Sequence, residues 1–283
     1  MRLRGRFGQR GDASWRRAVI CWVFAVAVGA SCARPHVPAT PREMRVLVYN
    51  VHAGKDAAGR DNLSRVADLV REVRADVVLL QEVDRYTRRS GQVDQPDTLA
   101  RRTGFAVAFG KTLDYDGGEY GIATLSRWPI THQTLTRLPV EPPQRRSGGS
   151  YEPRGAQRVT VRVPGADLTL VNTHLDASRD DHYRRQEIRT VLAIARDAAP
   201  LVLVGGDLNS TPDSEVQAEV RTGGLRDAWL ECGHGDGFTY PADAPTKRID
   251  YLYLTGSATC ASAIVLETAA SDHRPLLVTV RMK

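Results

Sequence analysis

The chain has 283 residues, of which 42% are hydrophobic and 25% charged, and its formal charge is +6. This apolar content is enough for one large core or two small ones, and it excludes a disordered, collagen-like or disulfide-only scaffold. The negative mean hydropathy also excludes a polytopic membrane protein, while the basic excess points at first to nucleic acid or anionic lipid.

The first 31 residues are predicted to be an export signal. Six arginines and one acid, Asp12, precede an uncharged run of 13 residues from Ala18 to Ala30. A helix of that length rises only about 20 Å, short of the roughly 30 Å hydrocarbon core of a bilayer, so the run fits a secretory signal better than a membrane span. After residue 31 the chain has 33 cationic and 32 acidic side chains. Most of the basic excess therefore belongs to this signal and gives little evidence for nucleic-acid binding.

Cys32 follows the small residues at positions 29 to 31. The segment resembles a bacterial lipoprotein signal, in which Cys32 would carry the lipid and attach the protein to a membrane, although Gly29 stands where leucine is usual. Cleavage to a freely secreted protein and an uncleaved anchor are the alternatives. In each case we expect the folded part to be exported, to the periplasm, the medium or the cell envelope.

Residues 32–43 contain three prolines and no apolar periodicity, which predicts an extended tether. Residues 44–283 show no second linker and no internal repeat, so we expect one domain. Cys232 and Cys260 both lie in this domain. In an oxidising compartment a pair 28 positions apart can form one disulfide, which we predict, and two reduced, buried thiols are the alternative.

Short apolar runs bounded by Gly, Pro, Asp or Asn predict strands along the whole domain. The predicted strands are residues 45–49, 77–80, 122–125, 159–163, 168–172, 201–204, 249–254 and 276–280. Helical periodicity begins behind Asn62, a candidate N-cap, and returns from Ile188 to Ala195. Several strands in succession argue against a purely alternating fold and favour two mixed sheets packed face to face, with helices outside. The loop at 138–155, rich in Pro and Gly, is predicted to be a flap beside the active site.

Polar residues cluster at the ends of the predicted strands. They are Asn50, Gln81, Glu82, Asn172, His174, Asp207, Asn209, Asp250, Ser271, Asp272 and His273. One such residue is usually a cap or a turn former, but the repeated set is harder to explain in that way. Carboxylates and carboxamides are oxygen ligands suited to a hard cation such as Mg²⁺, and a His paired with an Asp suits proton transfer.

These residues lie in an ordered series of motifs: YNVH, LLQEVD, GIATLSRWPI, NTHLD, GGDLNS, RIDYLY and SDHRPL. The series resembles the endonuclease/exonuclease/phosphatase superfamily of metal-dependent phosphoesterases, which includes DNase I, exonuclease III, sphingomyelinases and inositol polyphosphate 5-phosphatases. The resemblance runs from about Met44 to the C-terminus. It implies a four-layer α/β sandwich, with two mixed sheets between helices and the active site at one edge of the two sheets.

The resemblance also implies roles for a metal site. Glu82 is expected to be the principal ligand of Mg²⁺, or of Mn²⁺ in its place, with Asn50 beside it on the neighbouring strand end. Asp272 is expected to be a second acidic group near the metal, although it could equally cap a turn. His273 resembles the catalytic histidine, held by Asp250, which would be costly to bury inside an apolar strand without a partner.

The remaining roles concern water and phosphate. His174 is expected to donate to a phosphate oxygen or the leaving group, and Asp207 to orient or deprotonate the attacking water. Asn209, two residues from Asp207 on a predicted extended segment, should point to the same side and hold both Asp207 and a phosphate oxygen. Tyr120 and Arg154 are candidate phosphate contacts, although the tyrosine could simply pack and the arginine could be solvated on its loop.

The expected reaction is in-line attack of water on phosphorus, without a covalent enzyme intermediate. The substrate remains open among nucleic acid, a phospholipid headgroup and an inositol phosphate, and we expect a monomer. A non-catalytic phosphate- or lipid-binding module that kept the fold is the alternative, although none of the expected polar positions is substituted. A Ser/His/Asp hydrolase is disfavoured because no G-x-S-x-G elbow is present.

Overall fold

The structure is a computed structural model that describes residues 43–143, 152–198 and 201–282. The predicted export signal, Cys32, residues 32–42 of the predicted tether and the middle of the predicted flap lie outside the described residues. The described residues belong to one compact unit. Within the described ranges, no helix is both long enough and apolar enough to cross a bilayer.

Twelve strands and five α-helices are formed within the described part of the chain. The strands are β1 (Glu43–Asn50), β2 (Val77–Arg85), β3 (Ala106–Tyr115), β4 (Gly118–Ser126), β5 (Ile130–Arg137), β6 (Gly155–Val163), β7 (Ala166–His174), β8 (Val202–Asp207), β9 (Arg226–Asp227), β10 (Asp250–Leu254), β11 (Thr259–Val265) and β12 (Leu276–Arg281). The helices are α1 (Leu63–Glu72), α2 (Gln95–Thr103), α3 (His182–Arg196), α4 (Glu215–Thr222) and α5 (Ala228–Cys232), with a short 3₁₀ turn η1 (His52–Gly54) after β1.

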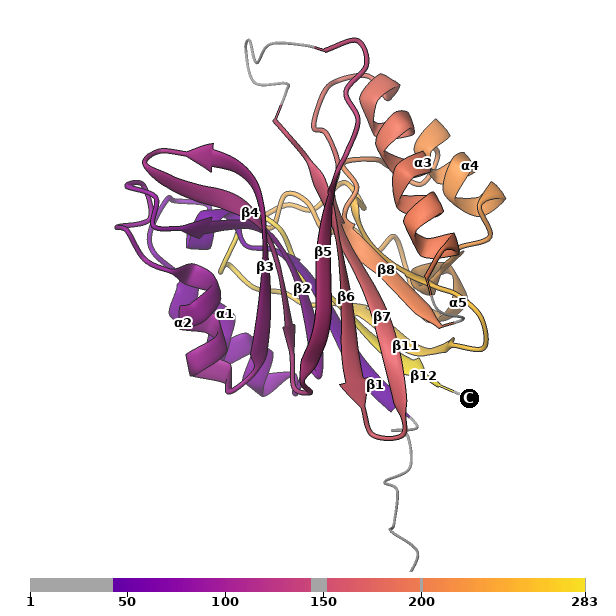
Figure 1. The fold of residues 1–283 in the computed structure, drawn as a ribbon, viewed down its shortest axis with the longest axis horizontal. Helices are drawn as coiled ribbons and strands as arrows, with labels where there is room; N and C mark the ends of the chain where they lie inside the picture. Colours follow the sequence, from indigo (N-terminus) through magenta and orange to yellow (C-terminus); the bar gives the residue numbers. More distant parts are fainter. Residues whose placement is uncertain (1–42, 144–151, 199–200, 283) are drawn as a thin grey trace, which may run out of the picture. The chain divides into compact units, whose positions relative to one another are not determined.

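The strands form two six-stranded sheets, in the orders β11-β12-β1-β2-β4-β3 and β5-β6-β7-β8-β10-β9. Each sheet has one parallel pair at its centre, β1 with β2 and β7 with β8, and its other neighbours are antiparallel. Figure 1 shows α1 and α2 on one side of the paired sheets and α3 and α4 on the other. This arrangement confirms the four-layer α/β sandwich.

The alternation of side chains along β1 shows how the layers are built. Val46 and Val48 belong to the core between the two sheets, where they meet Leu170 of β7. Leu47 and Tyr49 point the other way, into the core under α1 and α2. Because successive side chains on a strand point to opposite faces, an apolar run with both faces covered is what a central strand of a sandwich requires. A third core covers the other sheet beneath α3 and α4.

The predicted strands all form, but four further strands were not predicted. They are β3, β5, β9 and β11. β5 is almost wholly exposed along ITHQTLTR, so its sequence lacks the apolar pattern that burial imposes on a strand. Asn62 occupies the N-cap position of α1, as predicted, but its side chain makes no cap hydrogen bond and donates instead to the Ala269 carbonyl at 3.2 Å.

A disulfide joins Cys232 to Cys260, whose Cα atoms are 5.8 Å apart. Cys232 ends α5, which directly follows the edge strand β9 of one sheet, while Cys260 lies in β11, the edge strand of the other. The predicted pairing is therefore the one present in the structure, and it links the edges of the two sheets.

Candidate active site

The candidate site forms where the central strands of both sheets end. In one sheet the parallel register sets Asn50 of β1 beside Gln81 of β2. In the other sheet Asp207 of β8 lies between His174 of β7 and Asp250 of β10. Parallel neighbours end at the same edge of a sheet, so the strand-end residues are brought together from distant parts of the chain.

Gln81 connects the two halves of the site. Its amide nitrogen donates to Asn172 Oδ1 at 2.7 Å, and the Asn172 amide donates in turn to the carbonyls of Leu80 and Ala123 at 3.0 and 2.9 Å. All of these groups are buried, and the bonds run from β7 of one sheet to β2 and β4 of the other. Gln81 and Asn172 therefore fix the spacing of the two sheets next to the site.

A bulge in β2 sets the direction of Glu82. The register with β4 shifts between Leu80 and Val83, and Glu82 has a φ of 57°. A non-glycine residue is rarely found in this left-handed region, and such outliers are concentrated at functional sites. Without the shift, Val83 would point between the sheets, but it packs in the outer core with Leu80. The extra residue is Glu82. Its carboxylate lies beside the end of β1, where it accepts a hydrogen bond from Asn50 Nδ2 at 3.0 Å.

The turn after β8 differs from the prediction. Asn209 has a φ of 49°, so Asp207 and Asn209 do not share a side through strand alternation. Instead the backbone N–H of Asn209 donates to Asp207 Oδ1 at 2.9 Å, a local turn that Asn adopts more easily than most residues. The turn still brings the Asn209 amide within 3.1 Å of His174 Nε2. The expected proximity of these residues is present, but it has a different cause.

Asp207, Asp250 and His273 form a buried, hydrogen-bonded group. His273 Nδ1 lies 2.9 Å from Asp250 Oδ2, and His273 Nε2 lies 3.6 Å from Asp207 Oδ2. Burial disfavours the charged imidazole, but the two carboxylates outweigh this effect and raise the pKa of His273 to about 10. Burial and the neighbouring Asp250 raise the pKa of Asp207 to about 7. The group can therefore hold and exchange a proton near neutral pH.

His174 has the opposite character. Its Nδ1 lies 2.8 Å from Arg154 Nη1, and because a guanidinium can only donate, Nδ1 is the acceptor and the ring proton is on Nε2. The Asn209 amide nitrogen, 3.1 Å from Nε2, is then a second donor at this position and does not accept the ring proton. Burial, followed by the charges of Arg154 and His273, holds the pKa of His174 well below its usual value. Its Nε2 lies 3.6 Å from Asp207 Oδ2. His174 is thus a neutral donor facing the same point as Asp207.

The structure distinguishes between the alternatives for Arg154 and Tyr120. Arg154 is only 6% exposed, so it is not a solvated loop residue. Tyr120 is 7% exposed and packs in β4, yet it also lines a small cavity beside Glu82. Asp272 is partly exposed, and its Oδ1 lies 3.7 Å from His52 Nδ1 and 3.2 Å from Ser271 Oγ.

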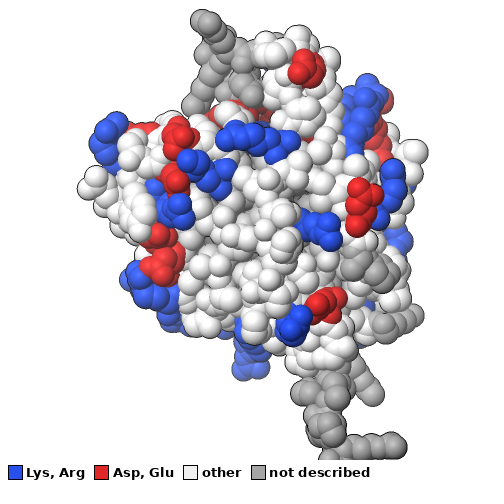
Figure 2. Space-filling view, in the orientation of Figure 1, with Lys and Arg blue, Asp and Glu red and all other residues white. Residues whose placement is uncertain are grey.

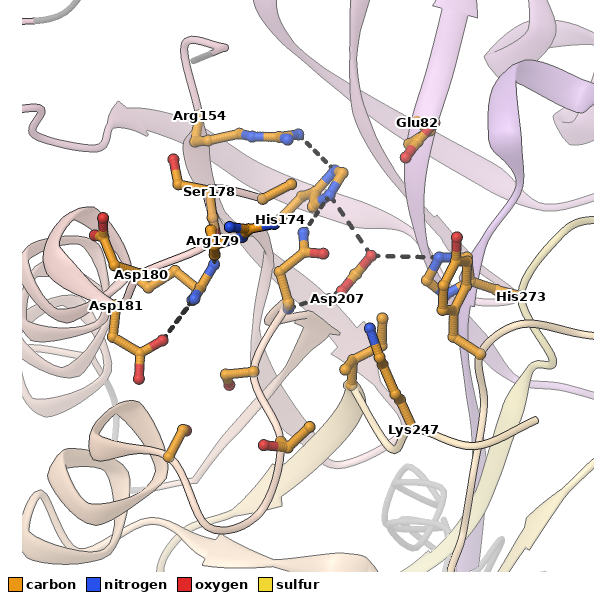
Figure 3. Close-up of a pocket in the computed structure, with 18 of the residues that line it drawn as sticks. Glu82, Arg154, His174, Ser178, Arg179, Asp180, Asp181, Asp207, Lys247 and His273 are labelled. Atoms are coloured by element: carbon orange, nitrogen blue, oxygen red, sulfur yellow. Dashed lines mark hydrogen bonds and ion pairs between the residues drawn. The ribbon is translucent and has the colours of Figure 1, made fainter. Parts of the chain in front are cut away.

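One cavity of about 870 Å³ is lined by seven of the predicted site residues: Glu82, Arg154, His174, Asp207, Asn209, Asp272 and His273. Figure 3 shows Glu82 and Arg154 on one side of it, with Asp207 and His273 facing them and Lys247 beyond Asp207. The lining also contains residues that were not predicted, among them Tyr240, whose ring centroid is 4.8 Å from that of His273, and the cations Arg179 and Lys247. Each of these three lies in an irregular segment without strand periodicity, so no local sequence signal marks it.

Two sets of side chains could hold a cation. Ligand atoms of Asp207, Asp250 and His273 lie within 4.8 Å of one another, but a short hydrogen bond already pairs His273 with Asp250. Glu82 and Asp272 instead present carboxylates to the cavity, which suits a hard cation. Asn50 turns its amide nitrogen, not its oxygen, toward Glu82 and Asp207, so it would have to rotate this amide to become a ligand.

Comparison with known proteins agrees with this geometry. The sequence profile of the endonuclease/exonuclease/phosphatase family matches residues 47–273. The chain belongs to this family. The Escherichia coli K12 protein YbhP, which is described as uncharacterized, is 30% identical over 252 residues, covering 84% of this chain and 96% of YbhP.

Solved structures show the same fold. A mannosyl-6-phosphatase from Bacteroides thetaiotaomicron superposes with a TM-score of 0.68 at 18% identity, over 84% of this chain and 100% of that one. The human nocturnin catalytic domain with a bound sulfate anion gives a TM-score of 0.67 at 20% identity, over 87% and 96%. At these identities the likeness shows the fold. It does not identify the substrate, which has to be inferred from the site.

Proposed function

We propose that the protein is a metal-dependent phosphoesterase that hydrolyses its substrate by direct attack of water on phosphorus. The observation that carries the proposal is the joint placement of the Asp207, Asp250 and His273 group and the neutral His174 around one cavity, opposite Glu82. A proton acceptor, a proton donor and an acidic cation ligand are the parts that such a reaction needs.

Glu82 and Asp272, with Asn50 after rotation of its amide, would hold the cation. A bound Mg²⁺ or Mn²⁺ supplies positive charge that polarises the phosphoryl group and offsets the charge developing on its oxygens. The oxygen-only donor set fits such a hard cation better than a soft one.

The remaining side chains handle protons and stabilise the phosphate. Asp207 orients the water and takes its proton, while Asp250 fixes the ring of His273 and supports its charged form. The Nε2–H of His174 faces the same point and donates to a phosphate oxygen. Arg154 holds that tautomer of His174 and adds a fixed positive charge at the cavity wall.

The charge of the cavity favours an anionic substrate without specifying duplex DNA. Arg179 and Lys247 line the cavity, and the side chain of neither is bonded to any residue that the structure describes. On the molecular face in Figure 2, basic and acidic residues alternate, and the described residues form no continuous basic surface there. A small phosphoester, such as an inositol phosphate or a lipid headgroup, therefore fits at least as well as nucleic acid.

The export signal predicted at residues 1–31 leads us to propose further that the enzyme acts outside the cytoplasm, freely or attached through a lipid on Cys32. Fractionation of cells that express the full chain, with a Cys32→Ser variant, tests this directly. The wild type should appear in the cell envelope or the medium, and recovery only in the cytoplasm would contradict the proposal.

Hydrolysis of bis(p-nitrophenyl) phosphate with Mg²⁺ or Mn²⁺ tests the proposed activity. We expect His273→Ala and Asp207→Ala to lower turnover by roughly 10²-fold or more with little change in folding, and excess EDTA to abolish it. Arg102→Ala, which changes an exposed residue outside the cavity, is the control and should behave as wild type.

A broader panel would identify the substrate: plasmid DNA, an abasic oligonucleotide, sphingomyelin and inositol phosphates. Turnover by His273→Ala near the wild-type rate, or activity that survives chelation, would contradict the proposed mechanism. Failure to hydrolyse any compound, together with failure to bind Mg²⁺, would instead favour the non-catalytic module.

A further inference from the structure

A second, smaller cavity of about 190 Å³ adjoins the candidate active site. Its lining consists of Glu82, Arg89, Leu113, Tyr115, Tyr120, Glu152, Arg154 and Ala177. It shares Glu82, Arg154 and Ala177 with the large cavity, but Asp207 and His273 do not contribute to it. We call it the side cavity. It opens on the Glu82 and Arg154 side of the site, which Figure 3 shows across from Asp207 and His273.

Aromatic rings form one wall of the side cavity. The rings of Tyr115 and Tyr120 are 6.2 Å apart and tilted by 54°. The guanidinium carbon of Arg89 lies 4.5 Å from the centroid of Tyr115 and 5.4 Å from that of Tyr120. Leu113, two residues before Tyr115 on β3, adds an apolar surface.

This wall is held rigidly before any ligand arrives. Arg89 donates from Nε and from Nη2 to the two oxygens of Asp84, each at 2.7 Å. Asp84 is fully buried in β2 and also accepts from Thr87 Oγ1 at 2.6 Å. A forked pair of this kind fixes the plane of the guanidinium, so the surface needs little ordering when it binds a ligand.

The size and chemistry of the side cavity suit one planar ring. A cavity of roughly 150 Å³ is known to hold a benzene molecule, so the volume of 190 Å³ accommodates a single ring with a small substituent, although the side cavity is also lined by charged residues. Tyrosine rings and a guanidinium offer flat faces for stacking, and Arg89 also offers donors at its edge. A flexible alkyl chain would use neither property.

We propose that the side cavity is a subsite for a planar ring carried by the phosphoester, an aryl group or a nucleobase. The inference rests on the proposed function, because the phosphate must lie between Glu82 and Asp207 for the ring to reach the side cavity. It also indicates the side from which the leaving group departs. In-line displacement places the leaving group opposite the attacking water, and the side cavity lies opposite Asp207 and His273.

Two phosphonates that cannot be hydrolysed test the subsite by direct binding. Calorimetric titration of the Mg²⁺-loaded protein should show phenylphosphonate binding roughly tenfold more tightly than methylphosphonate, the difference expected from one stacked ring. The measurement does not depend on turnover, so it separates ring recognition from catalysis.

Variants on β3 identify the surface responsible. Tyr115→Leu should reduce the preference for the phenyl compound to within about twofold without changing methylphosphonate binding. Phe109→Leu is the matched control: Phe109 is a ring on the same strand, with the Arg85 guanidinium carbon 4.8 Å from its centroid, and it lines neither cavity. Leu113→Phe fills the side cavity and should weaken only the phenyl compound.

The outcomes separate the two proposals. Equal binding of the two phosphonates by the wild type, or an unchanged phenyl preference in both Tyr115→Leu and Leu113→Phe, would overturn the ring subsite and leave the phosphoesterase proposal in place. Binding of neither phosphonate would show that the phosphate site itself is absent, and both proposals would fail.

Discussion

His273 and His174 show how neighbouring charges give opposite properties to two buried residues of one type. Each ring lies 3.6 Å from Asp207 Oδ2. Two carboxylates surround His273 and favour its charge, whereas the fixed charge of Arg154 faces His174 and opposes it. Neighbouring titratable groups whose pKa values are driven apart are what acid and base roles in one site require.

Replacing Asp250 with Asn should remove the main support of the charged His273. We expect the pKa of His273 to fall from about 10 toward its ordinary value. Burial lowers this pKa, and one carboxylate fewer would then offset that effect. Hydrolysis should fall by roughly 10²-fold. A pH titration of the ring resonances by NMR measures the pKa. Asp243→Asn, which removes an exposed charge nearby, should leave it unchanged, and an unaltered pKa in Asp250→Asn would refute this account.

Glu187 of α3 predicts a pH dependence of stability. Its side chain is fully buried, accepts from the Asp176 N–H at 2.8 Å, and burial raises its pKa from 4.5 to about 7. Between these pH values the folded state keeps a proton that the unfolded state releases, so stability falls as pH rises through this window. Above pH 7, ionisation of the buried Glu187 should lower the free energy of unfolding by on the order of 3 kcal/mol.

Glu187→Gln should therefore be more stable than the wild type at pH 8, while the two should be nearly equal at pH 4.5. Urea unfolding at both pH values measures the difference. An equal gain or loss of stability at the two pH values would show that the substitution acts through packing and not through ionisation.

At the scale of elements, the junction of β7 with β8 is the most constrained part of the site. Gly206 pairs with Thr173 and has a φ of 147°, and a Cβ added to it would lie 1.8 Å from the Thr173 carbonyl oxygen. The strands approach closely because glycine lacks this atom, and their closeness sets the relation of His174 to Asp207.

Gly206→Ala should destabilise the protein by about 3 kcal/mol or more, because the backbone of β7 would have to move. Gly59→Ala is the control for the effect of an unusual φ alone. Gly59 has a φ of 76°, but a Cβ added to it meets nothing within 4 Å, so we expect this variant to lose only about 1 kcal/mol of stability. Thermal unfolding compares the two. Similar losses in both variants would mean that strand proximity is not the cause.

At the scale of the molecule, the disulfide is the covalent link between the edges of the two sheets. Reduction, or the double substitution Cys232→Ser with Cys260→Ser, should lower the free energy of unfolding by about 3 kcal/mol for a loop of this length. Activity at low temperature should persist, since neither cysteine lines the active-site cavity. Thiol titration of the denatured, unreduced protein provides the direct check, and two free thiols from this pair would contradict the link.

The sequence by itself determined the layers and the residue types at the strand ends. Buried central strands need apolar runs, and polar groups where those runs end are visible without any coordinates, as with Glu82 after VVLL and Asp207 after LVLVGG. Exposed strands such as β5 carry no such pattern, because side chains that remain in contact with solvent do not need to be apolar.

Only the tertiary structure decided which of these groups meet. The pairing of Arg154 with His174, the contact of Tyr240 with His273, the left-handed turn at Asn209 and the side cavity behind Glu82 all depend on how the two sheets pack. Local sequence fixes periodicity and turn chemistry, whereas distances across a sandwich are set by registers and bulges that involve partners far away in the chain. For this reason the sequence indicates the reaction, while the substrate must be inferred from the cavity.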